Sequence, residues 1–126
     1  NNPKSLFVAK FVGSPQMNII NTDKERNLAL CLSKKLKIEM NKVKNFGVRP
    51  EAIKLVQKNN GDIDATIETI QPTGADWIIG LNVSGKSMFL ISSEQPIGKE
   101  NDTIGITFKE EGCHSFDSND LKIVKS

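Results

Sequence analysis

Residues 60–70 of the 126-residue chain read NGDIDATIETI, and this stretch carries the prediction of the fold. The Asn-Gly pair is typical of the end of a preceding helix, and Gly61 suits the left-handed position that often follows a helix. Asp62 belongs to the residue types that cap helix N-termini. Behind it, an apolar stripe recurs at helical spacing, formed by Ile63, Ile67 and Ile70. The stretch therefore predicts a short helix that begins after Asp62 and ends before residues 72–74.

Two further helices are predicted upstream. Thr22 and Glu25 form a capping-box pattern, in which Thr22 caps the helix and Glu25 reaches back. Apolar residues follow at helical spacing: Leu28, Leu32, Leu36, Met40 and Val43. This helix, or two in succession, should run to about Asn45. Pro50 suits the first position of the next helix, because a missing N–H costs nothing there.

After Gly74 the sequence is typical of β-structure. Short apolar runs at 77–83, 87–91, 103–108 and 121–124 are separated by turn residues. Residues 5–12 form a similar run near the start of the chain. We therefore predict three parts: an N-terminal strand and loop (1–21), a helical module (22–72) and a small β domain (73–126).

Residues 37–71 resemble the UBA-like superfamily of three-helix modules. The resemblance depends on Phe46-Gly47-Val48, on residues 51–56 and above all on residues 60–70. The β tract resembles a small SH3-like or Tudor-like barrel through residues 103–108, 111–116 and 120–124. The expected fold class is α+β, a three-helix UBA-like bundle followed by a small antiparallel β-sheet or SH3-like barrel.

The resemblance implies a non-catalytic protein-interaction module, with ubiquitin as one candidate partner. In ubiquitin-binding members, the loop after the first helix and the end of the third helix form an apolar patch. The matching positions in this chain are Phe46, Gly47, Val48 and Thr69. The alternative is that Phe46 and Val48 are core residues that join two helices.

Charge is unevenly distributed along the chain. Residues 34–58 carry eight basic and two acidic groups, net +6, and residues 59–126 carry five basic and eleven acidic groups, net −6. A basic helical tract favours an acidic partner, so nucleic-acid binding is the alternative function. Its candidate residues are Lys34, Lys35, Lys37, Lys42 and Lys44. The competing interpretation is a solvated charged face.

Residues 80–87, GLNVSGKS, match the phosphate-loop pattern G-x-x-x-x-G-K-[ST]. A phosphate loop must follow a strand and open a helix, so that its N–H groups face the phosphates. Residues 88–91 are apolar and soon reach Pro96, which is typical of a strand followed by a loop. The sequence therefore favours a hairpin, in which residues 77–83 turn at Ser84-Gly85 into residues 86–91.

No catalytic constellation is evident in the sequence, so we expect no enzyme activity, no cofactor and no metal site. Cys31 and Cys113 lack metal-ligand spacing, and two reduced thiols are favoured over a disulfide. The single histidine, His114, follows Cys113, and neighbouring strand residues point to opposite faces. No apolar run approaches the length of a membrane span. We expect an intracellular protein, cytoplasmic or nuclear, without a membrane partner.

Overall fold

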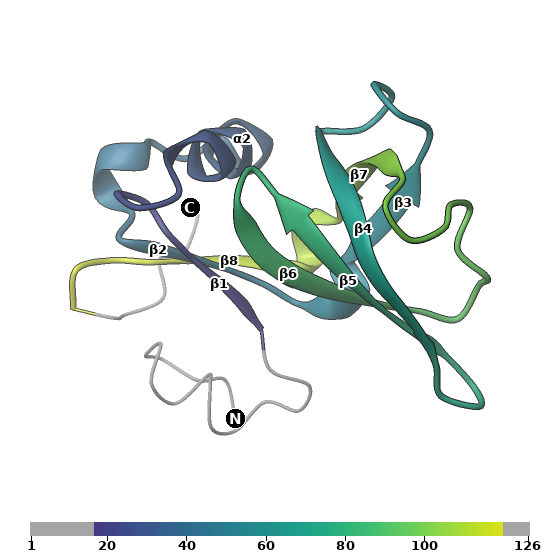
Figure 1. Ribbon diagram of the computed structural model, residues 1–126. Helices are drawn as coiled ribbons and strands as arrows, with labels where there is room; N and C mark the ends of the chain where they lie inside the picture. The colour runs from purple at the N-terminus through teal and green to yellow at the C-terminus, as the bar shows by residue number, and fades with distance from the viewer. Residues whose placement is uncertain (1–16, 120–126) are drawn as a thin grey trace.

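A computed structural model describes residues 17–119 of the chain (Figure 1). The strands are β1 Asn18–Asn21, β2 Asn45–Val48, β3 Ile53–Val56, β4 Ile63–Pro72, β5 Trp77–Val83, β6 Lys86–Ser92, β7 Thr103–Phe108 and β8 Cys113–Phe116. The helical segments are α2 Arg26–Leu36 and the 3₁₀ turns η1 Met40–Lys42, η2 Pro50–Ala52 and η3 Glu110–Gly112. The predicted α+β class with a three-helix bundle is wrong, because the described residues form two β-sheets and a single α-helix.

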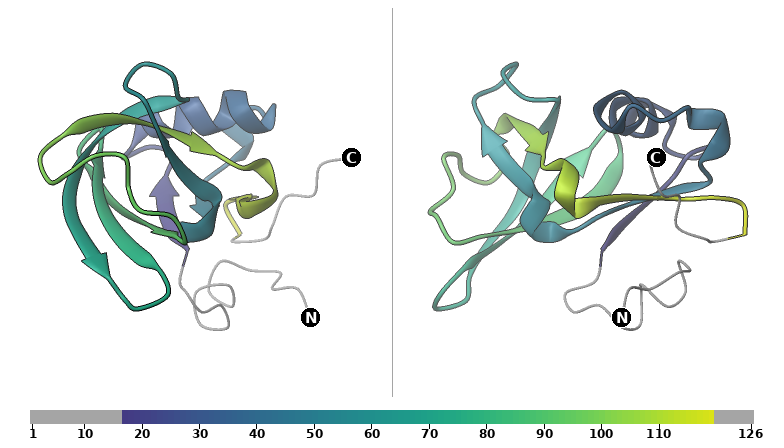
Figure 2. Two further views of the ribbon diagram at one scale, coloured as in Figure 1. Left: turned by 90° about the vertical axis from the view of Figure 1, so that its right-hand side faces the viewer. Right: turned by 180° about the vertical axis from the view of Figure 1, so that it is seen from behind.

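The two sheets are antiparallel throughout. One has the strand order β3-β7-β4-β5-β6, and the other has the order β1-β2-β8. The five-stranded sheet curls so far that its end strands, β3 and β6, contact each other (Figure 2). It is therefore barrel-like. The three-stranded sheet and α2 lie on one side of it (Figure 1).

Residues 63–72 form a strand because two neighbours pair with them. The first part of β4 pairs with β7, from Ile63↔Ile106 to Thr66↔Thr103, and the second part pairs with β5. The register shifts between Ile67 and Thr69, which marks a β-bulge. The predicted third helix is wrong, and with it the UBA-like bundle over residues 37–71.

Gly61 is required because its backbone lies very close to the backbone of Ile106 in β7. A Cβ atom on Gly61 would lie 2.4 Å from the carbonyl oxygen of Ile106, so no larger residue fits beside β7. Gly61 does not have a positive φ, so the predicted left-handed cap there is wrong; Asn59 is the nearby residue with positive φ, at 72°. Asp62 does not cap a helix either. Its carboxylate accepts a hydrogen bond from the N–H of Phe108 at 2.9 Å.

The first predicted helix exists, but it is shorter than expected. Lys37 adopts a left-handed conformation with φ 56° and ends α2 there, well before Asn45. Pro50 opens only the single 3₁₀ turn η2, and β3 follows directly, so the predicted second helix is also wrong. No helix within residues 17–119 is long and apolar enough to cross a membrane.

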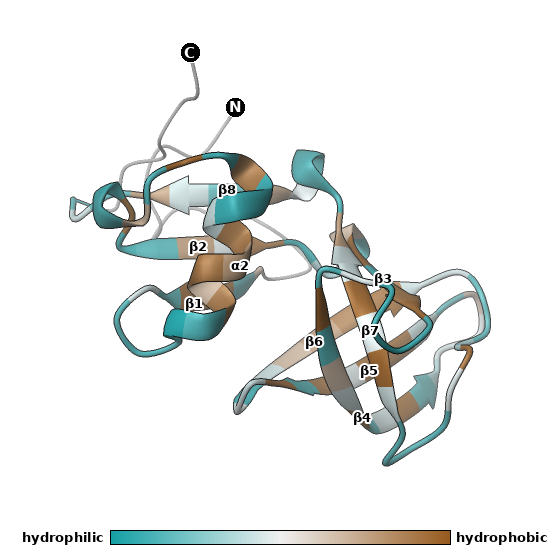
Figure 3. Ribbon diagram, turned by 90° about the horizontal axis from the view of Figure 1, so that it is seen from above, coloured by the Kyte–Doolittle hydropathy of each residue, from teal (hydrophilic) through white to brown (hydrophobic). Residues whose placement is uncertain are grey.

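The predictions made from the sequence are more accurate for the later strands. The runs at 77–83, 87–91 and 103–108 are confirmed as β5, β6 and β7, while the runs at 5–12 and 121–124 lie outside the described residues. Figure 3 shows hydrophobic residues along these strands, and buried and partly exposed residues alternate along β5 from Ile79 to Val83. The division between residues 72 and 73 falls at the end of β4, which continues through a turn into its partner β5.

Both sheets and α2 contribute to one buried apolar cluster. It includes Leu28, Leu32, Phe46, Val48, Ile67, Ile79, Leu81, Leu90 and Ile106.

Hydrogen bonds of one polar side chain, Asn18, join the two sheets beside this core. The side chain of Asn18 in β1 is 6% exposed, and it donates to the carbonyl oxygen of Phe89 at 2.9 Å and of Val48 at 3.1 Å. The N–H of Phe89 donates back to Asn18 Oδ1 at 2.9 Å. The amide thus pairs with the free edge of β6 as a strand would.

Asn18→Ala should lower the free energy of unfolding by about 2–4 kcal/mol, because it leaves two partly buried backbone groups of Phe89 without their partner. Urea unfolding of the 126-residue chain measures this loss. Asn27→Ala, at an exposed position of α2, is the matched control and should change stability by less than about 0.5 kcal/mol. Equal stabilities of the two variants would show that the Asn18 hydrogen bonds do not stabilise the fold.

Candidate functional site

The phosphate-loop pattern lies in a β-hairpin. Residues 80–83 belong to β5 and residues 86–87 to β6, and Val83 pairs with Lys86 across a two-residue turn. Ser84 has φ 51° and Gly85 has φ 86°, as a type I′ turn requires. The N–H of Gly85 donates to the side-chain oxygen of Asn82 at 3.0 Å. The expected hairpin is confirmed, and no helix follows the loop to present amides to a phosphate.

The turn geometry predicts opposite effects of two substitutions. Ser84→Asn should raise the free energy of unfolding by about 0.5 kcal/mol, since asparagine is favoured at this position of a type I′ turn. Gly85→Ala should lower it by about 1–2 kcal/mol, because a Cβ atom is strained at positive φ. Thermal unfolding of both variants tests the assignment. Two changes of the same sign would contradict a type I′ hairpin.

The four residues of the predicted docking patch do not form one surface. Phe46, Gly47 and Val48 occupy β2, the central strand of the three-stranded sheet, and Phe46 and Val48 are both 0% exposed. Gly47 packs against Met17 and Phe116. Thr69 is exposed, but it belongs to β4 in the other sheet and lies opposite Gly80. The helical patch therefore does not exist, and Phe46 and Val48 are core residues.

Phe46→Ala should lower the free energy of unfolding by about 3–5 kcal/mol, as expected for a fully buried aromatic ring. Chemical denaturation provides the measurement. Thr69→Ala, the other exchange within the predicted patch, should cost only about 0.5 kcal/mol on the exposed face of β4. A Phe46→Ala chain as stable as the parent would place this side chain outside the core.

The basic tract is divided among several environments. Lys34 and Lys35 lie in the last turn of α2, Lys37 ends the helix, and Lys42 and Lys44 lie in and after η1. Two of them have acidic partners. Lys35 Nζ lies 3.2 Å from Asp62 Oδ2, and Lys42 Nζ lies 3.5 Å from Glu39 Oε2. The five lysines therefore do not follow one face of a long helix, which was the basis of the nucleic-acid interpretation.

The cysteines are not arranged for nucleophilic chemistry. Both are free thiols. Burial raises the pKa of Cys113 to about 12, and its Sγ lies 3.4 Å from the carbonyl oxygen of Lys109. Burial also raises the pKa of Cys31, with a further contribution from nearby Asp62. Thiols with raised pKa values stay protonated and unreactive at neutral pH. Within residues 17–119, no group of three or more His, Cys, Asp or Glu side chains could hold a metal ion.

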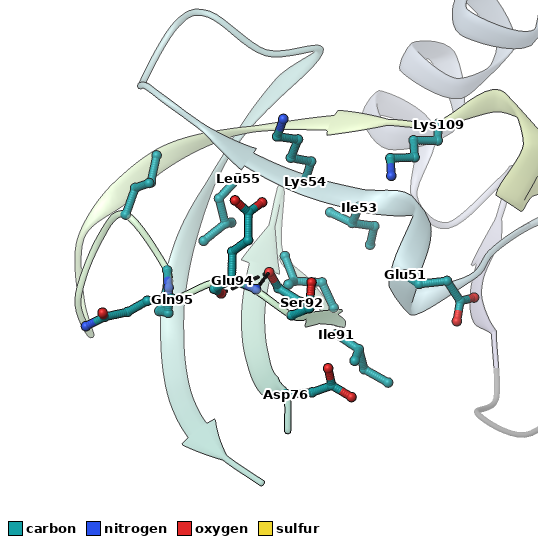
Figure 4. Close-up of a pocket in the computed structure, with 14 residues that line it drawn as sticks. Glu51, Ile53, Lys54, Leu55, Asp76, Ile91, Ser92, Glu94, Gln95 and Lys109 are labelled. Atoms are coloured by element: carbon teal, nitrogen blue, oxygen red, sulfur yellow. Dashed lines mark hydrogen bonds between the residues drawn. The ribbon is translucent and has the colours of Figure 1, made fainter. Parts of the chain in front are cut away.

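A cleft of about 660 Å³ opens where the barrel closes between β3 and β6 (Figure 4). Its apolar base includes Ile53 and Leu55 on β3 and Ile91 on β6, while charged groups of both signs surround it. The segment after β6 folds over one side, where Ser92 Oγ accepts from the N–H of Glu94 at 3.0 Å and donates to the Glu94 carbonyl oxygen at 3.0 Å. The cleft therefore combines an apolar base with a charged rim.

The described residues therefore define a small antiparallel β-barrel with a flanking three-stranded sheet, and not a helical interaction module. The model of the family described as TOBE domain matches residues 46–116, from β2 to β8. The chain belongs to the TOBE domain family.

Several ATP-binding proteins are similar to this chain. The "sn-glycerol-3-phosphate import ATP-binding protein UgpC 2" of Rhizobium johnstonii is 32% identical over 119 residues, 90% of this chain and 32% of that protein. UgpC of Pectobacterium atrosepticum is 32% identical over 125 residues, 92% of this chain and 35% of the relative. An "uncharacterized ABC transporter ATP-binding protein YcjV" of Escherichia coli O6:H1 is 28% identical over 130 residues, 94% of this chain and 36% of the relative. The chain spans about a third of the length of the curated relatives it matches.

These findings correct the functional predictions. The UBA-like assignment and ubiquitin as a partner are wrong, because the matching family is the TOBE domain and its region here is β-structure. The alternative of nucleic-acid binding is wrong as well, since the relatives are named as transporter ATP-binding proteins. The same names contradict the expectation of a protein without a membrane partner. Sequence reasoning missed the family because it assigned most of residues 46–70 to helices.

Proposed function

We propose that this chain is the non-catalytic TOBE part of an ATP-binding protein that serves a solute importer. Its similarity to a third of each relative, over nine-tenths or more of its own length, supports this proposal. The relatives named UgpC import sn-glycerol 3-phosphate, so a phosphorylated small solute is the substrate class that we propose for the transporter.

The absence of ATP chemistry in this chain is part of the proposal. The observation that supports it is the hairpin at residues 80–87, whose turn residues have the backbone of a type I′ turn and precede a strand. The contribution of the domain is then its surface. The mixed apolar and charged cleft between β3 and β6 is our candidate for contact with the rest of the transporter.

The importer assignment also sets the partner and the location. An importer needs a component that spans the membrane, and no helix within residues 17–119 is long and apolar enough to do so. We therefore propose a membrane-spanning partner subunit and a position on the intracellular side, where ATP is available.

A chimera tests the proposal. The region of Pectobacterium atrosepticum UgpC that matches this chain is replaced by residues 1–126, and uptake of sn-glycerol 3-phosphate is measured in cells that lack their own UgpC. We expect uptake well above that of cells carrying UgpC without the matching region, because the domain supplies the same contacts. The isolated chain should neither bind nor hydrolyse ATP.

Two results would overturn the proposal. One is a chimera that is soluble and retains ATP hydrolysis but supports no more uptake than the shortened UgpC. The other is ATP hydrolysis by the isolated chain. The Asn18→Ala chimera lacks the hydrogen bonds between Asn18 and the backbone of Phe89. It is the control for folding and should import less than the parent chimera.

A further inference from the structure

The turn before α2 leaves one buried hydroxyl group without a partner. Thr22 is 5% exposed, and its Oγ1 forms no hydrogen bond with any described residue. Thr22 does not cap α2, whose N-cap residue Glu25 makes no side-chain capping hydrogen bond; the neighbouring Asn21 instead stabilises the turn that precedes the helix. Asn21 Oδ1 accepts hydrogen bonds from the N–H groups of Asp23 and Lys24, both at 3.0 Å, and Glu25 Oε1 accepts from the N–H of Asn21 at 2.8 Å. Buried hydroxyl groups are normally satisfied, so an unpartnered one requires an explanation.

The same threonine lines a cavity of about 740 Å³ between the start of α2 and η1. Three cationic side chains line it, Arg26, Lys42 and Lys44, against one carboxylate, Asp23. Lys42 has an exposed partner in Glu39, whereas Arg26 and Lys44 form no ion pair with the described residues. Arg26 also begins α2, so the positive end of the helix dipole is adjacent.

We propose that this cavity binds the phosphate group of a small phosphate monoester. Two unpaired cations match the near-dianionic charge of such a group at neutral pH, and its oxygens accept charge-assisted hydrogen bonds. The Thr22 hydroxyl supplies a further donor. Thr22 lines the cavity, and its hydroxyl is buried; in our proposal a rotation about χ1 to another staggered rotamer brings this hydroxyl to the ligand.

The size and the walls of the cavity indicate an ester instead of the bare anion. The volume exceeds that of one phosphate group, and Met40 and Val43 add apolar surface on the η1 side. An organic substituent on the phosphate would cover this surface and gain from its burial. The proposal goes beyond the transporter function and does not depend on it, because it concerns only residues of this chain.

Calorimetric titration of the 126-residue chain with inorganic phosphate and with propyl phosphate, at constant ionic strength, tests the proposal. We expect saturable binding of both, with propyl phosphate binding more tightly. Thr22→Val should weaken binding roughly tenfold or more, because it removes a hydrogen bond to a charged acceptor. Its melting temperature should not fall, since the hydroxyl has no partner to lose. Lys44→Gln should weaken binding similarly.

Lys99→Gln is the matched control. It removes the same charge at an exposed position between β6 and β7, outside the cavity, and should leave binding unchanged. Two results would overturn the proposal. One is the absence of saturable binding for either probe tighter than about 10 mM. The other is that Thr22→Val and Lys44→Gln bind as tightly as Lys99→Gln, which would show that any association is only general attraction to a positively charged chain.

Discussion

The β-bulge between Ile67 and Thr69 is the constraint on which the barrel depends. β4 pairs with β7 before the bulge and with β5 across and beyond it, so this strand holds both halves of the five-stranded sheet. An extra residue bends a strand and increases its twist. The sheet can then curl until β3 and β6 meet, and the cleft forms at that junction. Asn18 in β1, a strand of the other sheet, stabilises the curled sheet by hydrogen bonding to the backbone of Phe89 at the edge of β6.

The same bulge explains why the sequence of β4 predicts a helix. Ile63 and Ile67 are four residues apart, which places them on one face of a helix and equally on one face of a strand. Ile70 should then leave that face, but the bulge inserts Glu68 and returns Ile70 to the side of Ile67, opposite Ile79. Helical spacing therefore arises within a strand. β5, β6 and β7 were predictable because turns separate them and no bulge interrupts them.

The functional surfaces were less accessible to sequence reasoning than the strands. Phe46 and Val48 were named for docking, yet pairing of β2 on both edges places them in the core. The capping box predicted at Thr22 does not form, because Asn21 Oδ1 accepts hydrogen bonds from the N–H groups of Asp23 and Lys24 in a turn, and α2 begins only at Arg26. Sequence spacing does not reveal this turn. The unpartnered Thr22 hydroxyl and the adjacent cavity, whose cations come from two segments, thus depend on tertiary structure.

Glycine serves two different purposes in G-x-x-x-x-G-K-[ST] patterns, and this chain separates them. In a phosphate loop, glycines let backbone N–H groups approach an anion ahead of a helix. Here Gly85 supplies the positive φ of a hairpin turn, and Gly80 leaves room for the side chain of Thr69, whose Oγ1 would lie 2.4 Å from a Cβ atom at Gly80. Each glycine is required by strand geometry alone. The pattern alone therefore does not distinguish a phosphate loop from a hairpin, and in this chain its backbone is that of a hairpin.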